Sequence, residues 1–212
     1  LPDVGQELQA GLEACHLGEV GHAQVREGDG IESPGLRAAV RAVLPLGEVM
    51  VTAPCEQQSG AGRSLPNTND GAIHEIFYPV DGQRVQAYAI FGSPAQAVLY
   101  ALVELVPRQP SLCVAGINFG ENVGSGVTGS GTVGAALEAA DEGVLALAAS
   151  LETDKQYHYS HSEELDFSAA THFTRFFAEQ MLSRQLPADV DLLKLEVPCD
   201  ATTETPWRAT RL

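Results

Sequence analysis

Basic side chains are scarce in this sequence of 212 residues, which has 12 Lys and Arg against 28 Asp and Glu. The formal net charge of −16 repels the phosphates of nucleic acids and of anionic membranes, so non-specific binding to either is excluded. A small phosphate ester held through a metal ion is compatible with this charge. Hydrophobic residues make up 44% of the chain, which allows a core and excludes a disordered acidic tail.

Cysteine is also scarce, and no two cysteines form a C-x-x-C pair. The four cysteines are Cys15, Cys55, Cys113 and Cys199. This usage favours reduced thiols over a disulfide framework or a zinc site.

Long hydrophobic runs are missing as well. The longest, residues 97–103 and 144–149, are far too short to span a bilayer. Acidic residues such as Asp3 and Glu7 stand where a signal peptide would begin with basic ones. The sequence therefore predicts a soluble cytoplasmic protein with no membrane contact.

From residue 30 onward, strand patterns alternate with helix patterns. Strands are expected over residues 49–53, 72–78, 84–91, 112–117, 144–150 and 192–197. Helices are expected after Ser33-Pro34, after Ser93-Pro94, over residues 132–142, and from Asp166 to about Arg184. Asp81-Gly82 predicts the turn of a hairpin. This alternation predicts an α/β fold with a mainly parallel sheet covered on both faces.

The first 28 residues fit this scheme poorly. An apolar strand is expected just before Asp29, but only Val20 and Val25 there are good strand formers. Residues 7–15 are interpreted as a short helix.

Polar residues collect just after the expected strands, in the segments 28–30, 59–62, 116–122 and 129–132. Because the carboxyl ends of parallel strands share one edge of a sheet, these segments are expected to lie together. Carboxylate, hydroxyl and amide oxygens suit a hard cation such as Mg²⁺ or Mn²⁺. The Ser-Gly-Thr turn at 130–132 could bind a phosphate at a helix N-terminus, or could be only a helix cap. Asp29-Gly30 alone could be an ordinary turn.

Taken in order, these segments resemble the motifs of the SurE family of metal-dependent survival-protein phosphatases. The matching stretches are residues 29–37, 59–64, 92–95, 115–122 and 129–136, together with Val197-Pro198 and Thr210-Arg211-Leu212. The resemblance covers roughly residues 29–212.

The resemblance implies a Rossmann-like three-layer fold and hydrolysis of nucleoside 5′- or 3′-monophosphates or other small phosphate esters. It also implies a divalent metal, a cytoplasmic location, and a homodimer or homotetramer. By motif position, the catalytic residues would be Asp29 and Asn118. The metal ligands would be Asp29, Ser59 and Asn118, and the phosphate would be bound by Ser59, Gly60, Ser130, Gly131 and Thr132.

Because residues 1–28 match the family poorly, the chain is divided into a divergent segment, 1–28, and a SurE-like phosphatase domain, 29–212. Two departures from the family pattern are notable. The family motif has two adjacent aspartates, and Gly28 replaces the first of them. The chain also stops at Leu212, where family members usually continue into a segment used for oligomerisation. A non-catalytic or weakly active relative is therefore the alternative to an active phosphatase.

Three other patterns allow different interpretations. Gly124-x-Gly126-x-x-Gly129 matches a dinucleotide-binding fingerprint, with Glu152 downstream, but several polar residues separate it from the preceding strand. His158 and His161 could form a metal pair, and a surface loop is the better interpretation. Phe173, Phe176 and Phe177 are expected in the core.

Overall fold

The computed structural model describes residues 7–11, 33–55, 58, 60–67, 72–154, 165–183, 186–187 and 189–210. In this part of the chain, a seven-stranded sheet has the order β3-β4-β2-β1-β5-β6-β7. All neighbouring pairs are parallel except β3 and β4, which form the expected antiparallel hairpin around Asp81-Gly82. The strands are β1 (Glu7–Gly11), β2 (Glu48–Pro54), β3 (Ile73–Val80), β4 (Gln83–Ile90), β5 (Leu112–Phe119), β6 (Ala146–Leu151) and β7 (Leu192–Val197).

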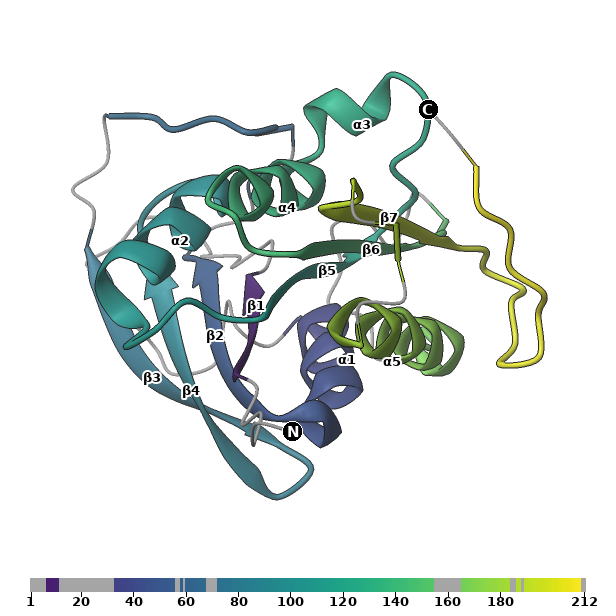
Figure 1. The fold of residues 1–212 in the computed structure, drawn as a ribbon, viewed down its shortest axis with the longest axis horizontal. Coiled ribbons are helices and arrows are strands. Elements are labelled where there is room, and N and C mark those ends of the chain that lie inside the picture. Colours follow the sequence, from purple (N-terminus) through teal and green to yellow (C-terminus); the bar gives the residue numbers. More distant parts are fainter. Residues whose placement is uncertain are drawn as a thin grey trace.

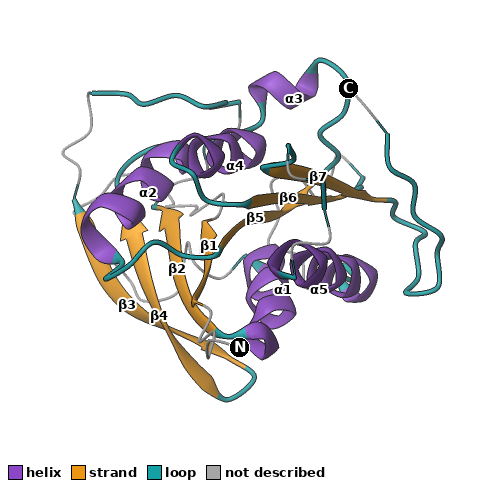
Figure 2. Cartoon of the chain, viewed as in Figure 1, coloured by secondary structure: helices purple, strands orange, loops and turns teal. Residues whose placement is uncertain are grey.

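Helices cover both faces of this sheet, as Figures 1 and 2 show: α2 and α4 lie on one face, and α1 and α5 on the other. Ser-Pro pairs begin two of them, and the Ser93 side chain and Gln96 form a capping box at the start of α2. The helical elements are α1 (Pro34–Val43), η1 (Leu44–Leu46), α2 (Pro94–Tyr100), the π-helix η2 (Ala101–Leu105), α3 (Gly126–Gly129), α4 (Gly131–Asp141) and α5 (Ser168–Leu182).

The core has two parts because each central strand presents alternate side chains to the two helical layers. On β6, Leu147 and Ala149 belong to the cluster beneath α1 and α5, whereas Ala146 and Ala148 belong to the cluster beneath α4. The predicted α/β class and the mainly parallel sheet are confirmed.

The connections on either side of β6 differ in hand. The connection from β5 through α4 to β6 and the connection from β6 through α5 to β7 each lead to the next strand in the same direction across the sheet. However, α4 and α5 cover opposite faces of the sheet. The two crossovers therefore have opposite hands, although a right-handed crossover is the general rule. As a result, the chain after β6 passes to the α1 face, where Phe167 packs edge-on against Phe119 at a centroid distance of 5.3 Å.

Two expectations about single elements are wrong. Residues 7–11, interpreted as part of a short helix, form the central strand β1, which pairs with β2 and β5. Phe176 is only partly buried, does not belong to the core, and contacts the exposed Trp207. Phe173 is buried in the core as expected, and Phe177 is partly buried and packs against the core and against Trp207.

Two further findings concern the part of the chain that the structure describes. No helix there is long and apolar enough to cross a membrane. Cys55 and Cys113 are buried, and Cys199 is exposed.

Candidate functional site at the carboxyl ends of the strands

Asn118 lies at the carboxyl end of β5, just after a register shift between Ala115 and Asn118. Before the shift, Leu112 and Val114 face α1 and α5; after it, Ile117 and Phe119 do. Even-numbered residues therefore face α1 and α5 before the shift, and odd-numbered residues face them after it. As a result, Asn118 lies on the α4 face.

Within the described residues, the amide of Asn118 makes one hydrogen bond, in which Nδ2 donates to the carbonyl oxygen of Gly120 at 2.8 Å. Within the described residues, nothing donates to Oδ1. This oxygen is therefore available to a cation, and a neutral amide oxygen is a normal ligand of Mg²⁺ or Mn²⁺.

The predicted phosphate turn forms the N-terminus of α4. Ser130 is the N-cap, and its Oγ accepts from the main-chain N–H of Val133 at 3.2 Å. Gly131 and Thr132 are the first residues of the helix and are buried. The first N–H groups of a helix have no acceptor inside it, and the helix dipole favours an anion there. Ser130 thus does cap the helix, and this role leaves the adjacent Gly131 N–H compatible with a phosphate.

The loop after β2, which includes Gly60, packs directly on α4. The N–H of Gly62 donates to the carbonyl oxygen of Gly129 at 3.1 Å. This approach requires glycine at position 134, because a Cβ there would overlap the Gly62 carbonyl oxygen and come within 2.7 Å of the Arg63 nitrogen. The structure therefore brings two of the four predicted segments, 59–62 and 129–132, together.

Arg63 ties the same loop to the side of α4. Its Nε donates to Glu138 at 2.6 Å and a terminal nitrogen donates to Asp141 at 2.5 Å. These hydrogen bonds, led by the one to Glu138, raise the pKa of the arginine. At the far end of the loop, the hydroxyl of Ser93 donates to the Ser64 carbonyl oxygen at 2.5 Å.

A polar row on the α4 face was not predicted. In the register of the sheet, Asn118 on β5 pairs with Ser150 on β6, which pairs with Glu196 on β7. Asn122 bridges two members of the row: its Nδ2 donates to Ser150 Oγ at 3.1 Å, and its main-chain N–H donates to Glu196 Oε1 at 2.9 Å. The row depends on the pairing of strands far apart in the chain, so no local sequence pattern could have revealed it.

Lys194 completes this row as the ion-pair partner of Glu196 Oε1. The side chains of Lys194 and Glu196 are only 13% and 26% exposed. Burial lowers the pKa of Lys194 to about 8, despite the contact with the carboxylate.

Asp29, Ser59, Gly28, His158 and His161 lie outside the described residues. Among the residues that are described, no cluster of three or more His, Cys, Asp or Glu could hold a metal ion. Of the predicted metal ligands Asp29, Ser59 and Asn118, the described residues therefore include only Asn118.

The dinucleotide fingerprint does not have the structural context that it needs. Gly126 and Gly129 are the ends of the short helix α3, and the turn at residues 120–125 separates them from β5. A phosphate-binding fingerprint of that class directly joins its strand to its helix.

Comparison with known proteins gives three findings. A family model described as "Survival protein SurE" matches residues 25–212. The chain is 44% identical over 184 residues to the protein named 5′-nucleotidase SurE of Thermococcus gammatolerans, covering 87% of this chain and 67% of that protein. It is 42% identical over 193 residues to the 5′-nucleotidase SurE of Methanothrix thermoacetophila, covering 89% and 71%.

Among solved structures, the crystal structure of the SurE protein from Aquifex aeolicus matches with a TM-score of 0.64 and 27% identity. The match covers 91% of this chain and 66% of that one. The chain thus spans about two thirds of the length of the relatives that it matches.

Proposed function

Because the chain belongs to the SurE survival-protein family, we propose that it hydrolyses phosphate monoesters, with nucleoside 5′- or 3′-monophosphates as the substrate class. The observation that carries the proposal is the packing of the Gly60–Gly62 loop against Gly129 and α4, next to the N-terminus of that helix. Asn118, at the carboxyl end of β5, offers an amide oxygen that accepts no hydrogen bond from the described residues. Relatives with more than 40% identity are named 5′-nucleotidases, which supports the same substrate class.

The phosphate would be bound where α4 begins. The main-chain N–H of Gly131 would donate to the anion there, beside Ser130 and Thr132, and the Gly60 loop would form the other side of the site. The loop is held in place without a substrate, since Gly62 binds Gly129 and Arg63 binds Glu138 of α4. Such preorganised donors stabilise the charge that develops on phosphate oxygens during hydrolysis.

A divalent cation would be held by Asp29, Ser59 and Asn118. The Oδ1 of Asn118, which accepts no hydrogen bond from the described residues, fits this role, and those residues contain no cluster of three or more His, Cys, Asp or Glu that could hold a metal ion without Asp29. When bound, such an ion supplies positive charge to a phosphate oxygen and makes a coordinated water more acidic. With Gly28 in place of the family's first aspartate, Asp29 is the single carboxylate of this set, which favours a weak metal site.

Gly28 is also the observation that favours the alternative, a weakly active or non-catalytic relative. The two alternatives differ in turnover, not in fold. For assembly and location, we propose a homodimer or homotetramer in the cytoplasm, on the family resemblance alone.

The test is the release of inorganic phosphate from adenosine 5′- and 3′-monophosphate with Mg²⁺, with Mn²⁺, and with a chelator. Metal-dependent release is expected from the natural chain. Asn118→Ala should abolish most of it at unchanged stability, because the side chain is only half-buried and donates one hydrogen bond.

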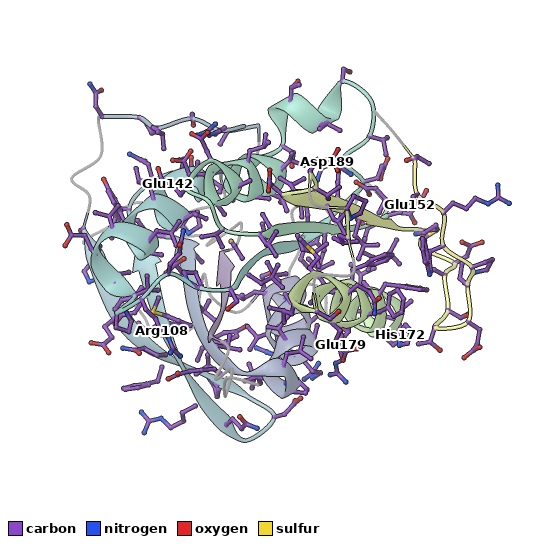
Figure 3. All side chains as sticks on the ribbon, in the orientation of Figure 1. Arg108, Glu142, Glu152, His172, Glu179 and Asp189 are labelled. Atoms are coloured by element: carbon purple, nitrogen blue, oxygen red, sulfur yellow. The ribbon has the colours of Figure 1, made fainter. Side chains whose placement is uncertain are left out.

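Gln109→Ala is the matched control. The Gln109 amide also donates a hydrogen bond to a main-chain carbonyl, that of Glu142, at 2.8 Å. Gln109 lies away from the candidate site. Its partner Glu142, which follows α4, and Glu152, which follows the carboxyl end of β6, lie on opposite sides of the molecule in Figure 3. Equal turnover for Asn118→Ala and Gln109→Ala at saturating metal would remove Asn118 from the site.

A further inference from the structure

The turn that follows β5 is fixed to the sheet at three points. The N–H of Gly120 donates to the Leu151 carbonyl oxygen at 2.8 Å. Asn122 supplies the other two, through its side chain to Ser150 and through its main chain to Glu196. Of the three acceptors, only Glu196 is charged.

This turn decides where the Asn118 amide points. Asn118 Nδ2 is bound to the carbonyl oxygen of Gly120, and Gly120 adopts a φ of 95°, in the region that favours glycine. A displacement of the turn would move the Gly120 carbonyl and rotate the amide with it. Glu196 therefore acts on Asn118 through Asn122 and Gly120.

Stability alone gives no reason for a partly buried ion pair at this place. Lys194 and Glu196 alternate along β7 with Leu193 and Leu195, which pack in the core, and the α4 face of the strand could hold apolar residues equally well. Apolar replacements of buried ion pairs are often as stable or more so. The carboxylate does supply a charge-assisted acceptor for the Asn122 N–H, which is about twice as strong as a neutral one. Its other oxygen, Oε2, is buried without a hydrogen-bond partner among the described residues, which adds to the cost of keeping it.

We propose that Glu196 is a positioning residue: it clamps the turn after β5 through the Asn122 N–H and so fixes the Asn118 amide in the geometry that the reaction needs. Lys194 is the ion-pair partner of the same carboxylate oxygen. The proposal rests on the proposed function, and it adds a residue outside the motifs on which the family resemblance depends.

The first test compares Glu196→Ala with Glu196→Gln. Removing the acceptor should lower kcat/KM about 10–100-fold, as is typical when a partner of a ligand is lost. Glutamine keeps an oxygen for the Asn122 N–H, so it should recover most of that loss. Equal losses in the two variants would show that the hydrogen bond is not what matters and would overturn the proposal.

Glu75→Ala is the matched control on the opposite edge strand, β3. Glu75 Oε1 likewise accepts a hydrogen bond, from Gln86 Nε2 at 3.0 Å, and it lies in the hairpin far from the turn. Its loss should leave kcat/KM unchanged.

Amide hydrogen exchange gives a readout that does not require turnover. In Glu196→Ala, exchange at Asn122 and Gly120 should become faster, whereas exchange along β2 and β4 should not change. If the natural chain shows no hydrolysis, the proposed function has failed, and the exchange rates still decide whether Glu196 clamps the turn. Unchanged exchange at Asn122 overturns the proposal in either case.

Discussion

Replacing Gly134 by alanine tests whether the close contact between α4 and the Gly60–Gly62 loop is essential. Gly134 lies inside α4, where alanine is normally preferred to glycine by about 0.8–1.0 kcal/mol. Helix propensity alone therefore predicts a more stable protein.

Packing predicts the opposite. The new Cβ would overlap the carbonyl oxygen of Gly62 and lie 2.7 Å from the nitrogen of Arg63, both of them main-chain atoms with no rotamer to adjust. Overpacking of this kind costs about 1–3 kcal/mol. Displacement of the loop would also break the Gly62–Gly129 hydrogen bond, worth about 0.5–1.5 kcal/mol. The sum exceeds the gain in propensity, so Gly134→Ala should lower the free energy of unfolding by about 1–3 kcal/mol.

Urea unfolding measures this change, and steady-state kinetics should show a raised KM, because the displaced loop forms one side of the phosphate site. Gly126→Ala is the control, since a Cβ at Gly126 meets nothing within 4 Å. A Gly134→Ala variant that is more stable than the natural chain and has an unchanged KM would refute the packing argument.

Two other outcomes are expected. Because burial lowers the pKa of Lys194 to about 8, the unfolded chain binds one more proton than the folded chain between about pH 8 and 10.5. The free energy of unfolding should therefore rise with pH in that window, by at most about 1.4 kcal/mol per pH unit from this group, and Lys194→Met should abolish that part of the rise in urea titrations at pH 7.5 and 9.5. An identical pH dependence in both proteins would contradict the assigned burial effect. Gly28→Asp should strengthen Mn²⁺ binding by about tenfold or more in calorimetry, since it restores a second carboxylate to the metal site, and it should raise phosphate release; no change in affinity would show that this position does not reach the metal.

Local chemistry was sufficient to predict most of the elements. Ser33-Pro34 and Ser93-Pro94 do begin helices, Asp81-Gly82 does form the hairpin turn, and the apolar runs before Asn118 and Glu152 are buried strands. In each case the residues that determine the element lie within it.

The strand β1 could not be predicted in this way. Its sequence, Glu-Leu-Gln-Ala-Gly, contains no β-branched or aromatic residue. It becomes a strand because β2 and β5 flank it and supply hydrogen-bond partners on both edges. Tertiary context therefore overrides a weak local preference.

The candidate site was predicted in part for the same reason. The Asn118, Gly60 and Ser130 segments were found as motifs, and the structure places them at the same edge of the sheet. The roles of Asp29 and Ser59 stay predictions. Glu196 and Arg63 were missed because their partners, Asn122 and Glu138, are 74 and 75 residues away, and only the folded sheet brings them into contact. Lys194 has a local partner, Glu196, so its place in the row becomes visible only once Glu196 is located.

The register shift in β5 also has an evolutionary consequence. Ordinary substitutions in this strand exchange one side chain for another and leave the direction of the rest unchanged. Loss or gain of a single residue between Ala115 and Asn118 would instead turn the amide toward α1 and bring Ile117 to the α4 face. In relatives that keep the activity, the amino-acid composition of β5 can therefore change, whereas the number of residues between these two positions cannot. Relatives with a short insertion or deletion there should have kept the fold and lost the activity.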